Sequence, residues 1–177
     1  MKRILTVTLV LLTFQGFCQK KLLLEPTPVN FIINNAGLKV NGSMSGLNGF
    51  ILIDPQNLSL YKIEGTIDPS TIQTGIALRD KHLKKADYFN VAESATIFMT
   101  STHIKKSSNR KYVGNFDLTI KGIKRSVAIP FTLSSTDNVY LLKGEFSINR
   151  LDFNLGESSI VLSDDVTVKI EFKTISQ

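Results

Sequence analysis

Ionisable and nucleophilic side chains in spacings typical of active sites are scarce in this 177-residue sequence. Its two histidines are His82 and His103, and the Asp80-x-His82 pair is too close to build a metal site without further ligands, which the sequence does not supply. No Gly-x-Ser-x-Gly elbow, phosphate loop or dinucleotide fingerprint occurs. We therefore predict no enzyme activity, no catalytic residue, no metal site and no cofactor.

Three cationic side chains suit a different task, the recognition of an anionic head group. They are Arg79, His82 and Arg150. A guanidinium can hold a phosphate through paired hydrogen bonds, and an imidazole can donate to one. The two arginines also have structural alternatives: Arg79 caps a loop or pairs with a neighbouring strand, and Arg150 belongs to a strand-end ion pair that fixes the connection to Asp164-Asp165. The sequence leaves both interpretations open.

The segment that carries Arg79 and His82 is the one clear helical interruption in a chain of strands. Thr74 is placed to cap a helix, and the segment ends in the aromatic pair Tyr88-Phe89. Apolar residues recur there at roughly helical spacing, at Ile76, Leu78, Leu83 and Ala86. We predict a short amphipathic helix within residues 67–89, with Tyr88-Phe89 pressed onto whatever the helix covers.

The rest of the chain alternates apolar and polar residues at the period of a strand. About eight such stretches are separated by mostly short turns, which favours an antiparallel meander over a parallel sheet. A single helix cannot cover the apolar faces of eight strands, whereas closure of the sheet can. We predict an all-β fold with one short helix, built as an antiparallel eight-stranded β-barrel whose interior either is filled or holds one ligand.

Several motifs, in this order along the chain, resemble the YceI-like family of lipid-binding proteins. The resemblance rests on residues 29–33, 40–42, 46–54, 70–75, 79–83, 87–91, 114–127 and 148–153. The family is known for a lipocalin-like barrel that holds a polyisoprenoid or another long-chain amphiphile in an elongated apolar cavity. The resemblance thus implies that this barrel binds an isoprenoid or acyl lipid, with transport or storage as its use.

The inward faces of the predicted strands provide the candidate lining of such a cavity. The candidates are Phe31, Ile63, Phe98, Phe116, Leu118, Phe131, Leu142, Phe146 and Ile148. Gly65, Gly114 and Gly144 share these faces, where a glycine either leaves room for a ligand or only relieves strain in the barrel. The alternative function is a structural or interaction protein of the same fold, with a filled core and no lipid.

The N-terminus has the pattern of a secretory signal. Met1-Lys2-Arg3 precedes an apolar run that is too short to span a membrane. We predict a signal peptide over residues 1–18, an N-terminal tether over 19–28 and the barrel domain over 29–175. Cleavage after Cys18 would place the mature protein in the periplasm or outside the cell, and acylation of this single cysteine as a lipoprotein is the less favoured alternative.

The charge of the chain is mildly basic. Loss of Lys2 and Arg3 with the leader lowers the formal charge from +6 to +4. The basic residues are spread along the sequence without a stripe interleaved with aromatics, so we predict no nucleic-acid partner. Attraction to anionic lipid head groups fits this distribution and predicts peripheral membrane contact. A homodimer is compatible with the sequence, but no feature selects it.

Overall fold

A computed structural model of the chain describes residues 19–54 and 57–175. The signal peptide predicted for residues 1–18, with its cleavage or acylation at Cys18, lies outside the described residues. Within the described ranges the fold is mostly β-structure with one α-helix. No helix in this part of the chain is long and apolar enough to cross a membrane.

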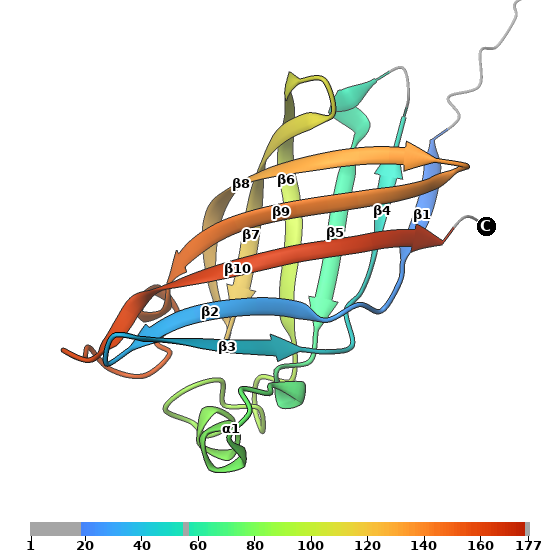
Figure 1. Cartoon of the computed structure of the whole chain (residues 1–177). Helices are drawn as coiled ribbons and strands as arrows, with labels where there is room; N and C mark the ends of the chain where they lie inside the picture. The colour runs from blue at the N-terminus through green and yellow to red at the C-terminus, as the bar shows by residue number, and fades with distance from the viewer. Residues whose placement is uncertain (1–18, 55–56, 176–177) are drawn as a thin grey trace, which may run out of the picture.

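Ten strands occur among the described residues (Figure 1). They are β1 (Lys20–Leu24), β2 (Val29–Asn35), β3 (Leu38–Met44), β4 (Asn48–Ile53), β5 (Lys62–Ile67), β6 (Ile97–Ser108), β7 (Lys111–Ile120), β8 (Ile123–Thr136), β9 (Val139–Asn149) and β10 (Leu162–Ile175). Eight of them, in the order β1-β4-β5-β6-β7-β8-β9-β10, close into a ring because β10 pairs back onto β1. The predicted antiparallel eight-stranded barrel is confirmed.

The membership of the ring differs from the sequence prediction at the N-terminus. The stretch expected to be a tether contains β1, which pairs with β4 on one side and with the end of β10 on the other. Leu22 of this strand is completely buried. Pro26 and Pro28 fall between β1 and β2, where no ladder bond is needed. The segment is a strand of the barrel wall, and its five residues are too few to show an alternating pattern in the sequence.

Strand β2, expected to be the first barrel strand, forms a hairpin with β3 and pairs with the first half of β10. β1 and β2 therefore occupy successive stretches of the same β10 edge. The glycine-rich region after Asn35 contains strands β3 and β4. The hairpin turns at Ala36-Gly37, where both residues have positive φ, and the β7–β8 hairpin turns in the same way at Lys121-Gly122.

The helix is shorter than predicted. Helix α1 covers Ala77–Leu83, and its N-cap residue is Ile76, which makes no side-chain capping bond. Thr74 lies two residues too early to cap it. One-turn 3₁₀ helices occur at Leu58–Leu60, Pro69–Thr71 and Arg150–Phe153. In Figure 1, α1 lies below the barrel, near the end occupied by β2 and β3.

Packing divides the barrel into two unequal ends. The end formed by β1 and the β8–β9 turn, here called the filled end, is packed by one large cluster of buried side chains that includes Ile51, Ile129 and Leu142. The opposite end, here called the cavity end, carries α1, the β2–β3 hairpin and the turn Arg150–Phe153, with two small separate clusters. The interior is therefore incompletely filled at the cavity end.

Candidate functional site

A cavity of about 340 Å³ lies inside the barrel among these three clusters. Its deep wall includes Phe146, Ile170 and Phe172 from the large cluster, and its outer part reaches Arg79 and His82 of α1. Its lining is almost entirely apolar, with a few polar side chains. The remaining wall comes mostly from the strands, through Val29, Phe31, Ile33, Val40, Met44, Leu47, Gly65, Ile67, Ile97, Met99, Leu118, Ile120, Ile148, Val166 and Val168.

Four of the nine apolar positions predicted from the sequence line this cavity. They are Phe31, Leu118, Phe146 and Ile148. Four others are buried in the large cluster without lining the cavity, namely Ile63, Phe116, Phe131 and Leu142. Phe98 does neither, because its neighbours Ile97 and Met99 occupy the inward-facing positions of β6. The sequence thus identified inward faces in most strands but not how far along each strand the cavity extends.

Aromatic packing explains why the filled end has no such space. The Tyr112 ring stacks on Phe131 with 5.4 Å between centroids, and Phe116 meets Phe131 edge-on at 6.4 Å. The Phe116 ring also covers Gly114, where an added Cβ would lie 2.5 Å from its Cε2 atom. Glycine at this position therefore makes room for a neighbouring aromatic ring.

Gly65 behaves differently. An added Cβ there would meet Leu47 Cδ1 at 3.6 Å, an ordinary contact, and Gly65 lines the cavity. The inward glycines were expected either to leave room for a ligand or to relieve strain in the barrel. Room for a ligand fits Gly65. Neither explanation fits Gly114, because the Phe116 ring occupies the space beside it.

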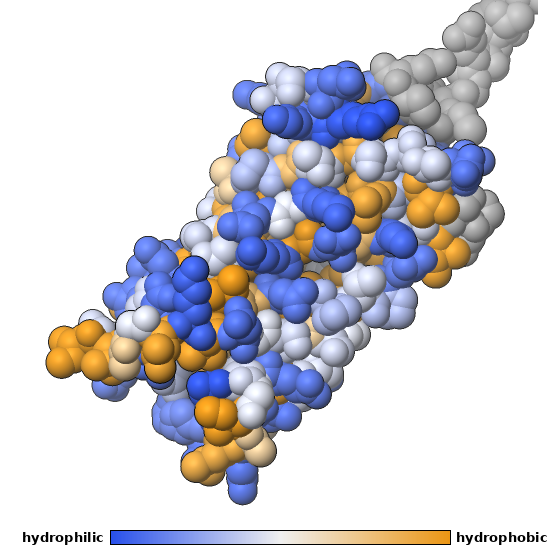
Figure 2. Space-filling view, in the orientation of Figure 1, coloured by the Kyte–Doolittle hydropathy of each residue, from blue (hydrophilic) through white to orange (hydrophobic). Residues whose placement is uncertain are grey.

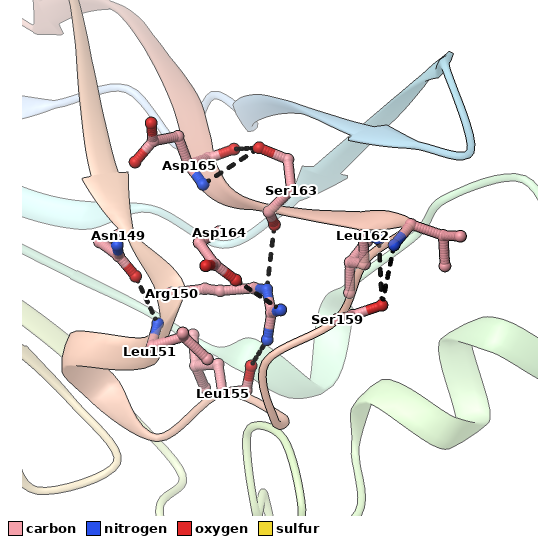
Figure 3. A network of polar contacts seen from close by, with 10 residues as sticks. Asn149, Arg150, Leu151, Leu155, Ser159, Leu162, Ser163, Asp164 and Asp165 are labelled. Carbon is pink, nitrogen blue, oxygen red and sulfur yellow. Dashed lines mark hydrogen bonds and ion pairs between the residues drawn. The ribbon is translucent and has the colours of Figure 1, made fainter.

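Arg150 is buried at the cavity end and is held by three contacts (Figure 3). Its Nε donates to the Ser163 carbonyl at 3.0 Å, Nη1 to the Leu155 carbonyl at 3.0 Å, and Nη2 to Asp164 Oδ1 at 2.8 Å. The register between β10 and β2 shifts between Leu162 and Val166, so Arg150 supplies donors where the strand bulges. These contacts match the structural alternative for this arginine.

Arg79 is fixed by a smaller network at the start of α1. Its Nε donates to Thr74 Oγ1 at 2.7 Å, and Nη2 donates to the Thr74 carbonyl at 2.6 Å. The Thr74 hydroxyl in turn donates to Asp80 Oδ1, which also accepts from the Thr74 amide at 2.9 Å. Among the described residues no partner contacts Nη1 of Arg79. This arginine therefore closes a loop, as the structural alternative proposed, while its Nη1 makes no hydrogen bond to the described residues.

His82 is exposed, and its ring meets the edge of Tyr88 with 5.0 Å between centroids. Gly156 lies against the same tyrosine, and its amide donates to the Asp87 carbonyl at 2.7 Å. A side chain at Gly156 would place Cβ 2.8 Å from the Tyr88 ring, so glycine allows this close approach. Phe89 packs against both small clusters, as the predicted aromatic pair implied.

Lys121 ties two segments of the cavity end together. Its Nζ donates to the Ala86 carbonyl at 2.6 Å and to the Asn154 carbonyl at 3.1 Å. The loop after α1 and the connection after Arg150–Phe153 are thus held to the β7–β8 turn. Sequence reasoning missed this role, because a lysine in a hairpin turn ordinarily extends into solvent.

The arrangement suits containment of an apolar chain better than a chemical reaction. The two arginines of the cavity lining, Arg79 and Arg150, lie at its outer part and hydrogen-bond to neighbouring protein groups. Within the described residues no group of three or more His, Cys, Asp or Glu side chains is arranged to hold a metal ion.

The sequence profile of the YceI-like domain matches residues 24–174. This chain belongs to the YceI-like family. YceI from Escherichia coli O157:H7 is 29% identical over 156 residues, which cover 84% of this chain and 81% of that protein. A UPF0312 protein of Photorhabdus laumondii is 34% identical over 102 residues, or 57% of this chain and 53% of that protein. The match with the Photorhabdus protein thus spans about half of its length.

Two solved structures have the same fold. Burkholderia cenocepacia BcnA superimposes with a TM-score of 0.78 at 20% identity, covering 84% of this chain and 96% of that one. A polyisoprenoid binding domain from Saccharophagus degradans superimposes with a TM-score of 0.71 at 14% identity, covering 88% and 98%. These likenesses show that the chain has the same barrel fold as the two solved structures.

Proposed function

We propose that this protein binds one long-chain amphiphile of the isoprenoid or fatty-acyl class, with its apolar tail inside the barrel. The cavity of about 340 Å³ is the observation that carries the proposal, because its walls are apolar while the rest of the barrel is packed. Its size lies within the range of small-molecule sites, roughly 300–1,000 Å³. The polyisoprenoid binding activity named for the Saccharophagus neighbour supports the same ligand class.

The energetics of such a site need few polar contacts. Each buried methylene contributes about 0.8 kcal/mol, so about ten of them give a gross gain near 8 kcal/mol. Ordering of the tail and loss of free motion reduce this gain. A free energy near 8 kcal/mol corresponds to a Kd of about 1 μM, so after these costs the expected affinity of the tail alone is weaker than micromolar, and head-group contacts must add to it.

The head group is proposed to lie at α1. Nη1 of Arg79 and the exposed ring of His82 are the donors at the outer part of the cavity. Arg150 contributes indirectly, because its three bonds hold the wall in place. A phosphate or carboxylate head group fits these donors.

The biological role is proposed to be carriage or storage of the lipid after export, without catalysis. The charged start and short apolar run of residues 1–18 support export to the periplasm or secretion. The filled-core alternative is disfavoured by the unfilled cavity end. A dimer stays a prediction from sequence.

A titration with a fluorescent polyene fatty acid tests the proposal. The purified protein should raise the probe's emission with one site per chain, and an isoprenoid phosphate should displace the probe. Absence of any emission change, together with no protection by isoprenoid or acyl lipids against thermal unfolding, would contradict it.

A further inference from the structure

The most exposed large apolar side chains of the described residues all gather at the cavity end. Ile160 is fully exposed, Leu78 is 79% exposed and Leu38 is 73% exposed, and Ile76 and Val161 are each 53% exposed. In Figure 2, apolar surface projects where the start of β10 and the β2–β3 hairpin lie in Figure 1, and again at α1. Elsewhere, Ile175 is 48% exposed, Val113 is 40% exposed, and Leu23 and Val139 are each 38% exposed. The asymmetry is more than the scatter of single surface residues that soluble proteins tolerate.

These side chains form two groups beside the cavity. The tip group is Leu38, Ile160 and Val161, brought together because the Ala36 amide donates to the Val161 carbonyl at 2.7 Å and Leu162 pairs with Asn35. The helix group is Ile76 and Leu78, at the start of α1.

Each group directly adjoins residues that line the cavity. Asn35, Val40 and Leu162 flank the tip group, and Thr74 and Arg79 flank the helix group. A surface that covered both groups would therefore lie at the outer part of the cavity.

Basic residues accompany both groups. Lys39 follows Leu38, and Lys81, Lys84 and Lys85 follow Leu78 within and after α1. Asp80 is turned inward by its bonds to Thr74. Exposed acids also occur at this end, namely Asp68, Asp87, Glu93, Asp152, Glu157 and Asp165, and Glu93 is engaged by Asn90. The local excess of lysines is therefore confined to α1 and the residues just after it. Lysines next to exposed aliphatic side chains are the combination that binds an anionic bilayer surface.

We propose that the cavity end docks on an anionic lipid bilayer, with the tip group and the helix group inserted among the head groups. The inference rests on the proposed lipid binding, since docking in this orientation brings the cavity against the lipid it would take up or deliver. The two groups stand on separate projections with lysines beside them, which suits a deformable bilayer better than a continuous protein groove.

Flotation with vesicles of phosphatidylethanolamine and phosphatidylglycerol tests the docking. The full mature chain should bind them, and the double variant Leu78→Ser with Ile160→Ser should bind at least about tenfold more weakly, because each lost aliphatic insertion is worth roughly that factor. Val113→Ser with Val139→Ser, exposed residues of the filled end, is the matched control and should bind like the wild type. Added salt should weaken the wild-type binding.

A parallel titration of a soluble polyene fatty acid separates this proposal from the proposed function. The double variant should keep the wild-type affinity for the soluble probe. Equal vesicle binding by both variants, or none by the wild type, would overturn the docking, and probe binding would then still support the carrier. Vesicle binding that depends on Leu78 and Ile160 without any probe binding would contradict the carrier and keep the docking. Self-association through these residues in place of vesicle binding would overturn the docking and assign the surface to a second copy.

Discussion

Replacement of Gly65 by leucine should block the cavity without damaging the fold. Gly65 lies on the cavity wall, and a Cβ added there would contact only Leu47 Cδ1 at 3.6 Å and the Asn48 carbonyl oxygen at 3.9 Å. Its φ lies outside the positive range, so a larger residue adopts the same backbone. The leucine side chain adds about four carbon atoms to the interior, and a bound lipid tail would have to leave the volume that they occupy.

The cost to binding follows from that displacement. Excluding about four methylenes at ~0.8 kcal/mol each removes roughly 3 kcal/mol, or about a 100-fold rise in Kd for a long-chain ligand. The ligand-free protein should instead gain about 1–2 kcal/mol of unfolding free energy, since a glycine in a strand is replaced by a buried aliphatic residue. Fluorescence titration gives the first quantity and denaturant unfolding the second.

Gly114→Ala is the matched control at the filled end. The new Cβ would lie 2.5 Å from the Phe116 ring, so overpacking should cost about 1–3 kcal/mol of stability. Its Kd should stay within about twofold of the wild type because the two regions are separate. Wild-type affinity in the Gly65→Leu protein, with its stability raised as expected, would refute the assignment of the cavity as the lipid site.

Three further predictions concern the framework around the cavity. Arg150→Met should cost about 2–4 kcal/mol of unfolding free energy, because three acceptors lose a buried donor. Arg150→Lys should recover little of this stability, since one ammonium group cannot reach all three acceptors. Denaturation midpoints near that of the wild type would contradict this prediction. Thr74→Val removes the hydroxyl that joins Arg79 to Asp80, at a cost of about 1 kcal/mol. Amide hydrogen exchange in α1 should accelerate by about fivefold, and unchanged exchange would show that the network does not hold the helix. Burial, aided by Tyr112, Tyr140 and Asp54, raises the pKa of Tyr61 above its usual value near 10. The folded state therefore keeps this proton more tightly than the unfolded state, and stability is lost as the pH rises through the raised pKa. Tyr61→Phe should flatten the alkaline fall in stability, and an identical fall in both proteins would argue against this origin.

Local periodicity was sufficient to predict a closed sheet, but it did not identify β1, the strand that closes the sheet against β10. Alternation identified most wall strands because their outer faces carry charges that pair across neighbours, such as Lys143 with Glu171 and Lys169 with Glu145. The strand β1 was missed because its five residues, KKLLL, show no period, and its pairing with β10 is set by the far end of the chain. Such long-range pairing leaves no local signature.

The candidate site, too, could be predicted only in part from the sequence. Inward positions such as Phe146 and Ile148 were accessible from alternation, but the split of the interior into a filled end and a cavity end depends on three-dimensional packing of rings such as Phe116 on Phe131. Phe98 was assigned to the wrong face because three consecutive apolar residues, Ile97 to Met99, leave the register of β6 ambiguous. Arg79 and Arg150 were chosen as candidates because of their residue type. Only their hydrogen-bond partners in the structure show which of their nitrogens bind the protein itself.

Native mass spectrometry of the mature protein, purified gently from a membrane extract, tests the lipid-carrier proposal most directly. We expect a stoichiometric apolar adduct that solvent extraction identifies as an isoprenoid or acyl lipid, and that is lost in the Gly65→Leu variant. A clean ligand-free mass that persists after incubation with isoprenoid and acyl lipids would contradict the proposal and leave the barrel as a scaffold for surface interactions.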